Sequence, residues 1–171
     1  MRAPHLILGI GELLWDMPAG TSQGTLGGAP ANFTVMAGRL GNHAAILSRI
    51  GRDDLGRDAV ERLNPMPVDT GALQVDATHA TGRVTVDLSQ PEPRYTIHGP
   101  VAWDYMQLSD EWVRLAERAN AICFGSLAQR SEQSRQTIQT LAAQTTSACI
   151  RVFDVGQLTA PILFTLDTVH P

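Results

Sequence analysis

Residues 27–32 read Gly-Gly-Ala-Pro-Ala-Asn, and they open a stretch, 31–40, whose apolar residues recur at helical spacing until Gly41. Short apolar runs at 5–10 and 44–50 lie on either side of it and are typical of buried strands. The order strand, helix, strand is that of a parallel sheet with helices on its faces. The sequence therefore predicts an α/β fold with a doubly wound parallel sheet.

The same alternation returns further along the chain. Ser109 can cap a helix that runs to about Arg118. The other predicted elements are a charged helix at 54–63, a strand at 121–124, a helix at 131–144 and a strand at 149–155. No regular element is predicted for 156–171, which we expect to be an irregular tail.

The middle of the chain has a different pattern. Residues 81–88 alternate between apolar and polar side chains, and 95–98 can return as a partner strand after two prolines. Such a half-exposed antiparallel ribbon, inserted between α/β units, is typical of a small lid. We expect the lid to be formed by segments near 17–26 and 81–98.

Composition limits the classes of function. The formal net charge is −4 and no basic run occurs, so a nucleic-acid partner is not expected. All 13 basic residues are arginine, which excludes a Walker A loop because that loop needs a lysine. Cys123 and Cys149 lie in apolar runs and are expected to be reduced core thiols of a cytoplasmic protein. The apolar run at 6–10 is too short to span a membrane.

Two polar clusters follow predicted strands. Asp16 comes shortly after the first strand, where a carboxylate can accept hydrogen bonds from the hydroxyl groups of a ligand. Gly27 and Gly28 let the backbone approach a ligand, and the amide of Asn32 suits a sugar hydroxyl. Taken singly, Asp16 could simply begin a turn, and the glycines could simply begin a helix.

Together these clusters resemble a known signature. The pieces are Gly-Glu-Leu-Leu-x-Asp at 11–16, Gly-Gly-Ala-Pro-Ala-Asn at 27–32, Arg-Leu-Gly at 39–41 and Ser-Arg-Ile-Gly-Arg-Asp-Asp-Leu-Gly at 48–56. In order and spacing the chain is similar to the ribokinase-like, phosphofructokinase-B type carbohydrate kinases, and the fructokinase branch is the nearest. The stretches Val-Asp-Thr at 68–70 and Phe-Gly-Ser-Leu at 124–127 also fit, so the resemblance covers about 5–155.

The resemblance implies an ATP-dependent kinase that transfers the γ-phosphate to a sugar hydroxyl with Mg²⁺. It implies that Asp16, Gly27, Gly28 and Asn32 contact the sugar, and that the β lid can pair two subunits in a homodimer. The segment 51–56 is expected to form a structural turn. No residue of this chain is assigned to ATP or to a metal, and none is expected to be catalytic.

The match ends before the chemistry that the family needs. The second family signature, Gly-Ala-Gly-Asp, provides the catalytic base and an anion hole, and this sequence does not contain it. Phe153-Asp154 is followed by Val-Gly-Gln-Leu, where the family commonly has Asn-Leu-Arg. We therefore expect a truncated, inactive sugar-binding half, or alternatively a non-catalytic sugar-binding module, a lid-dimerising module or a remnant. An open sheet edge should favour self-association.

Other polar and aromatic residues are expected to be structural. Glu12 could merely anchor a loop, and Asp154 at a strand end should support the fold. The three tryptophans are expected to pack in the core, with Trp103 a lesser candidate for covering a sugar face. The five histidines are scattered, without the spacing of a zinc site.

Overall fold

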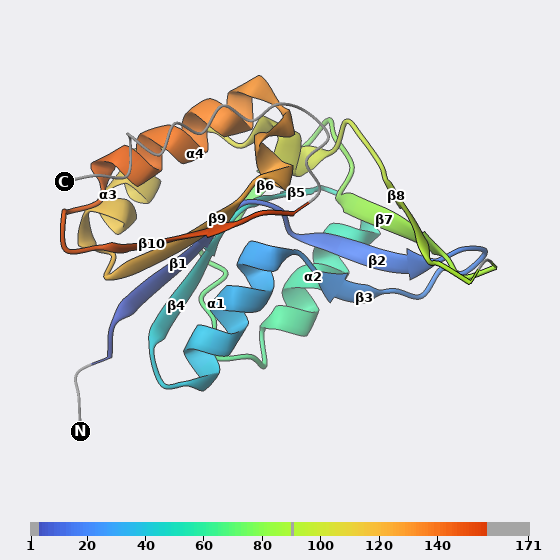
Figure 1. Cartoon of the computed structure of the whole chain (residues 1–171), viewed down its shortest axis with the longest axis horizontal. Helices are drawn as coiled ribbons and strands as arrows, with labels where there is room; N and C mark the ends of the chain where they lie inside the picture. The colour runs from blue at the N-terminus through green and yellow to red at the C-terminus, as the bar shows by residue number, and fades with distance from the viewer. Residues whose placement is uncertain (1–3, 90, 157–171) are drawn as a thin grey trace.

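The computed structural model describes residues 4–89 and 91–156. Sheet A, the central sheet, has four parallel strands in the order β10 (Ile150–Asp154), β9 (Ala121–Gly125), β1 (Leu6–Ile10) and β4 (His43–Leu47). Helices cover both of its faces (Figure 1). The predicted α/β fold with a mostly parallel sheet is confirmed.

The helices begin and end close to the predicted positions. They are α1 (Ala29–Arg39), α2 (Asp54–Leu63), α3 (Asp110–Arg118) and α4 (Glu132–Gln144). The hydroxyl of Ser109 accepts a hydrogen bond from Trp112 N–H and caps α3, as predicted. Helices α3 and α4 lie on one face of sheet A, and α1 lies on the other (Figure 1).

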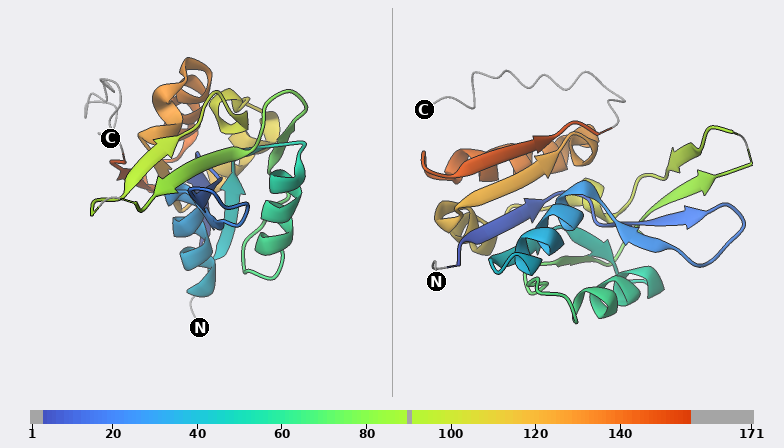
Figure 2. Two further views of the ribbon diagram at one scale, coloured as in Figure 1. Left: turned by 90° about the vertical axis from the view of Figure 1, so that its right-hand side faces the viewer. Right: turned by 60° about the horizontal axis from the view of Figure 1, so that its bottom comes forward.

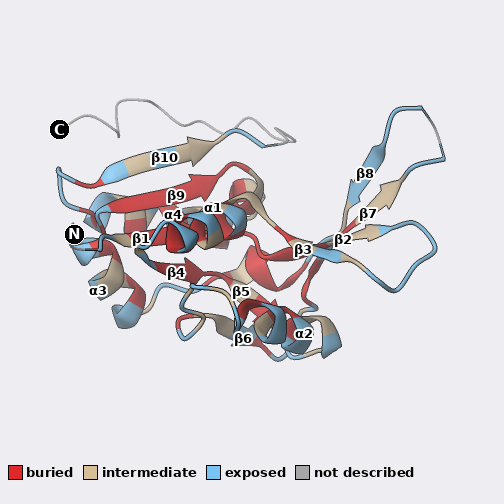
Figure 3. Ribbon diagram, turned by 90° about the horizontal axis from the view of Figure 1, so that it is seen from below, coloured by how far each residue is buried: buried red, intermediate tan, exposed pale blue. Residues whose placement is uncertain are grey.

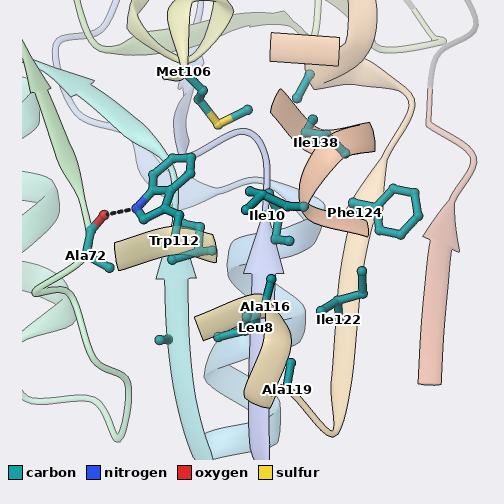
Figure 4. Close-up of a cluster of buried hydrophobic side chains, with 14 of the residues drawn as sticks. Leu8, Ile10, Ala72, Met106, Trp112, Ala116, Ala119, Ile122, Phe124 and Ile138 are labelled. Atoms are coloured by element: carbon teal, nitrogen blue, oxygen red, sulfur yellow. Dashed lines mark hydrogen bonds between the residues drawn. The ribbon is translucent and has the colours of Figure 1, made fainter. Parts of the chain in front are cut away.

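The main core fills the space between sheet A and helices α3 and α4. Leu8 and Ile10 of β1 face Ile138 of α4 and the fully buried Trp112 of α3 (Figure 4). The indole N–H of Trp112 donates to the carbonyl of Ala72 at 2.9 Å, so the ring is buried without leaving a polar group unpaired. All three tryptophans are at most 3% exposed, which confirms their expected packing role and removes Trp103 as a cover for a sugar.

A second sheet, sheet B, projects from the end of the molecule (Figure 2). Its strands are ordered β3 (Thr25–Gly27), β2 (Leu14–Pro18), β7 (Gly82–Asp87) and β8 (Arg94–Ile97). The pair β7–β8 is the antiparallel ribbon expected from the alternation in that region. Strands β7 and β8 lie within the expected lid segment 81–98, whereas β2 and β3 only overlap the two ends of the other segment, 17–26. The role of sheet B as a lid stays a prediction.

The predicted strand over 44–50 is wrong in one respect. The structure has two strands there, because the chain leaves sheet A after Leu47 and enters a separate parallel pair, β5 (Arg49–Gly51) with β6 (Gln74–Asp76). The guanidinium of Arg49 forms an ion pair with the Asp76 carboxylate at 3.0 Å. This ion pair links strand β5 to strand β6. The two residues are far apart in the sequence, so the local sequence around either one does not predict the contact.

Other short elements were also absent from the prediction. Residues 14–18 and 25–27 form strands for which no bounds were predicted, since β2 pairs with β7, far along the chain. Two single-turn helices, η1 (Ala102–Tyr105) and η2 (Leu127–Arg130), connect larger elements. Apart from Gly156, the tail expected at 156–171 lies outside the described residues.

The turn at 51–56 is structural, as predicted. One oxygen of Asp53 accepts a hydrogen bond from Gly56 N–H at 2.8 Å and caps α2. The Asp53 carboxylate also accepts hydrogen bonds from the backbone N–H and the hydroxyl of Thr81. Because Thr81 immediately precedes β7, this carboxylate joins α2 to the base of sheet B.

Candidate functional site

The candidate site lies where the chain passes from sheet A to sheet B. Strand β1 ends at Ile10, and the chain then turns through Gly11, with φ 146°, into strand β2. The first turn of α1 comes to the same place from strand β3. This is the carboxyl edge of the parallel strands, where open α/β sheets place their ligands.

Asp16 and Gly27 lie against each other in this region. Asp16 is a partly exposed residue of β2, and Gly27 is a buried residue at the end of β3. A Cβ atom on Gly27 would lie 2.8 Å from Oδ2 of Asp16, so only glycine leaves the carboxylate its present position. Partial burial raises the pKa of Asp16. Within residues 4–89 and 91–156, no donor binds this carboxylate, which leaves it free to accept hydrogen bonds from a ligand.

Gly28 forms the turn before α1. Its φ of 112° is a conformation that side chains rarely adopt, and a Cβ atom there would lie 2.2 Å from the carbonyl oxygen of Glu12. The carbonyl of Gly28 accepts a hydrogen bond from Asn32 N–H at 2.9 Å. This hydrogen bond joins the turn to the first residues of α1.

Asn32 is exposed in the first turn of α1. Together with Gly27 it lines a pocket of about 250 Å³ whose other walls are mostly apolar and come from α1, α2 and the strand before α1. Asp16 is not among the lining residues. The structure thus brings Gly27 next to Asp16 and next to Asn32, but it does not place Asp16 and Asn32 in one pocket.

Glu12 is buried beneath this turn, with 3% of the residue exposed. Burial is the main cause that raises its pKa to about 7, and the carboxylate of Asp154 raises it further. Hydrogen bonds from the backbone N–H groups of Ala29 and Ala128 act in the opposite direction. Its Oε2 atom has no hydrogen-bond partner in the described part of the chain. The sequence indicated only a loop anchor and gave no sign of this burial.

Residues 16–159 match the model of the pfkB family carbohydrate kinases. The chain belongs to the PfkB family. The match covers most of the 171 residues and begins at Asp16, so it includes β3 and α1 of the candidate site but not β1. The resemblance to the phosphofructokinase-B type kinases is therefore confirmed.

Proteins with similar sequences are named as sugar kinases or fructokinases. A sugar kinase from Pyrococcus horikoshii is 32% identical over 161 residues, which are 88% of this chain and 52% of that protein. A fructokinase from Klebsiella pneumoniae is 35% identical over 113 residues, a match that covers 65% of this chain and 36% of the fructokinase. The chain spans about half the length of the first of these relatives.

Solved structures of PfkB kinases share the fold. The crystal structure of the sugar kinase from P. horikoshii matches with a TM-score of 0.79 and 30% identity, over 95% of this chain and 54% of that one. A structure of that kinase in complex with ATP gives a TM-score of 0.78. The α/β architecture of this chain therefore matches about half of the longer sugar kinase from P. horikoshii.

Asp154 lies at the end of β10, beside the region occupied by Glu12. Its carboxylate oxygen would lie 3.7 Å from a Cβ atom on Gly125 and 3.6 Å from one on Gly156. Ser126, next along the chain from Gly125, is buried, and its hydroxyl has no partner within the described ranges. Asp154 thus takes part in a polar cluster that the sequence did not predict.

No group of three or more histidine, cysteine, aspartate or glutamate side chains suited to a metal occurs among residues 4–89 and 91–156. The chain also has no lysine that could hold a phosphate. In the same described ranges, no helix has the length and apolar content needed to cross a membrane.

Proposed function

We propose that this chain is the sugar-binding half of an ATP-dependent carbohydrate kinase of the fructokinase kind. The observation that carries the proposal is the Asp16 carboxylate, which is partly exposed, lies over Gly27 and has no donor within the described residues. The membership of the chain in the PfkB family supports a sugar as the ligand.

Each proposed contact has its own chemistry. Asp16 accepts hydrogen bonds from two sugar hydroxyls, and such bonds to an ionised group are about twice as strong as neutral ones. Gly27 and Gly28 bring backbone groups close to the sugar ring, because neither carries a Cβ atom. The amide of Asn32 both donates and accepts.

In the complete reaction, the γ-phosphate of ATP would pass to a sugar hydroxyl with the help of Mg²⁺. The relative whose structure contains ATP supports ATP as the phosphate donor. The 171-residue sequence has no Gly-Ala-Gly-Asp segment, and no residue described above is placed to act as the base. We therefore propose that the chain binds sugar without phosphorylating it.

Sheet B offers a second, compatible role as a surface for a homodimer. Strand β8 carries Tyr95, which is 55% exposed, and Ile97, which is partly exposed. In the register of the sheet they lie beside Val86 and Val84 of β7. An apolar strip on a projecting sheet is suited to pairing with the same strip of a second copy.

The buried, free thiols of Cys123 and Cys149 suit a reducing compartment, so we propose a cytoplasmic location. Nothing in the site suggests a nucleic-acid or membrane partner. The small-molecule sugar and a second copy of the chain are the proposed partners.

Calorimetric titration of the 171-residue chain with fructose and other sugars tests the proposal. We expect fructose binding by the wild type, at least about tenfold weaker binding by Asp16→Asn, and no change in Asp58→Asn, which alters an exposed carboxylate of α2. Absence of binding to every sugar would contradict the sugar site. Release of ADP from Mg-ATP in the presence of sugar would contradict the claim that the chain does not catalyse.

A further inference from the structure

The pocket of about 250 Å³ beside α1 has an apolar floor. Leu13, Ala31 and Leu63 line it, and each of them is at most 4% exposed. The three residues belong to one buried cluster, to which α1 and α2 both contribute. The pocket therefore reaches down to the core between the two helices. Partly buried apolar side chains complete its walls: Leu26, Val35 and Met66.

The rim of this pocket carries hydrogen-bond donors. Asn32 and Arg39 are exposed residues of α1 that line the pocket. They are seven positions apart, so they lie on the same side of the helix, about two turns from each other. Among the described residues that line the pocket, Arg39 is the single charged one and no carboxylate is present. The rim is therefore suited to a negatively charged group.

The guanidinium group of Arg39 is available to a ligand. Within residues 4–89 and 91–156 no carboxylate forms an ion pair with it. Its Nη1 atom lies 3.9 Å from Sδ of Met36, and a thioether is a weak acceptor. Met36 also lines the pocket, so this contact holds the guanidinium group at the rim.

The C-terminus of α1 does not compete for this charge. The carbonyl groups of Met36, Ala37 and Gly38 already accept hydrogen bonds from residues 40–42. Unpaired carbonyl groups at a helix C-terminus repel an anion, and here these three are paired. Arg39 therefore sets the sign of the charge at this end of the pocket.

We propose that this pocket binds a small amphipathic anion, with its apolar body against Leu13, Val35 and Leu63 and its carboxylate at Arg39. Apolar hollows hold water poorly, so an apolar group gains by entering one. A cavity of about 150 Å³ accepts a benzene ring, and the larger volume here suits a body of about eight carbon atoms. A medium-chain fatty acid has this size and this charge.

This second site is separate from the sugar site, although the two are neighbours. Gly27 and Asn32 line the pocket and are also proposed sugar contacts. Asp16, which carries the sugar proposal, does not line it. The anion is therefore titrated without sugar. Asp16→Asn should weaken sugar binding and leave binding of the anion unchanged, so failure of either proposal can be told from failure of the other.

The test is calorimetric titration of the 171-residue chain with octanoate. We expect saturable binding with a Kd on the order of 1 mM or below. Arg39→Gln should weaken it about three- to fivefold, since water partly screens an ion pair at an exposed rim. Arg118→Gln is the matched control, because Arg118 is an exposed residue in the last turn of α3, and it should bind like the wild type.

The charge of the ligand is tested with octylammonium, which has the same chain and the opposite charge. It should bind at least about threefold more weakly than octanoate to the wild type. Equal binding of the two ligands, or an Arg39→Gln variant that binds octanoate like the wild type, would overturn the choice of an anion. Absence of octanoate binding to the wild type would overturn the site itself.

The place of binding is tested by NMR of ¹⁵N-labelled protein. Octanoate should shift the amide resonances of Val35 and Leu63 in the wild type, and Val35→Phe, which fills the pocket, should remove these shifts. Shifts confined to β10, where Ile150 and Val152 are exposed, would show that octanoate binds the open edge of sheet A. That result would overturn the inference, whether or not the variant folds.

Discussion

At the scale of single residues, Gly28 is the glycine of the candidate site that leaves the least room for a side chain. Its φ is 112°, and a Cβ atom added to Gly28 would lie only 2.2 Å from the backbone carbonyl oxygen of Glu12. We expect Gly28→Ala to lower the free energy of unfolding by at least about 3 kcal/mol, because strain and a steric clash add. Denaturation with urea measures this change.

Gly20 provides the matched control for this substitution. Its φ of 78° is also positive, but no atom lies within 4 Å of the place of a Cβ atom. Gly20→Ala should therefore cost only about 1–2 kcal/mol, from backbone strain alone. Equal costs for the two substitutions would show that the contact between Gly28 and Glu12 is not rigid.

The buried carboxyl group of Glu12 predicts how stability depends on pH. Burial raises its pKa from an ordinary 4.5 to about 7, so the folded state holds the proton more tightly than the unfolded state does. Its contribution to stability is fully present below pH 4.5 and is lost as the pH rises to about 7. The loss amounts to about 3 kcal/mol.

Urea unfolding of the wild type and Glu12→Gln at several pH values measures this loss. The difference in free energy of unfolding between the two proteins should change by about 3 kcal/mol between pH 4.5 and pH 7 and then stay constant. A difference that does not vary with pH would show that Glu12 ionises as freely in the folded state as in the unfolded one.

The sugar contacts of Asp16, Gly27, Gly28 and Asn32 stay a prediction, but the structure shows how far sequence could locate them. Asp16, Gly27, Gly28 and Asn32 were chosen because their residue types and spacing form a motif, and the structure gathers Asp16 and both glycines at one edge of the sheet. The importance of Glu12 could not be predicted. Its burial depends on η2, which lies more than 100 residues further along the chain and has no local signal.

At the scale of secondary-structure elements, α2 depends on its N-cap, Asp53. The carboxylate of Asp53 accepts hydrogen bonds from Gly56 and Thr81. Burial alone would raise the pKa of Asp53, but these hydrogen bonds lower it below its usual value. The stability that they provide is therefore present at neutral pH and is lost in acid, as the pH falls through the lowered pKa.

Asp53→Ala should lower the free energy of unfolding by about 2 kcal/mol, since it removes a cap and leaves Thr81 without its partner. Asp54→Ala is the neighbouring control. Its carboxylate is 85% exposed and, among the residues that the structure describes, pairs only with Arg57, so a loss of about 0.5 kcal/mol or less is expected. Thermal unfolding near neutral pH compares the two, and similar losses would contradict the role given to the cap.

The elements differ in how well local sequence predicted them. The helices have clear periodicity, α2 and α3 also have side-chain caps, and the predicted bounds of the helices and of the strands of sheet A lie within a few residues of the structure. Strands β3 and β6 have three residues each, and β2, although as long as the strands of sheet A, is defined by its partners β3 and β7. A three-residue strand such as β6 has too few positions to show a period, so its pairing had to come from the tertiary structure.

At the scale of the whole molecule, sheet A has one open edge. Strand β10 pairs with β9 on one side, and in the described part of the chain no strand pairs with its other side. Ile150 is 65% exposed and Val152 is 37% exposed, and Figure 3 shows β10 as exposed and partly exposed beside the buried β9. At the opposite edge, β4 is bonded to Asp69.

An open strand with exposed apolar side chains favours association of one copy with another. We therefore expect the purified chain to self-associate, and Val152→Lys to reduce that association, because a charged side chain on an edge strand opposes pairing. Sedimentation velocity over a range of protein concentrations measures the effect.

Leu40→Lys is the control, since Leu40 is 80% exposed at the end of α1, away from the edge. If Leu40→Lys dispersed the protein as well as Val152→Lys did, general surface hydrophobicity would explain the association. If only substitutions of Tyr95 on β8 dispersed it, the copies would meet through sheet B, as in the homodimer proposed above.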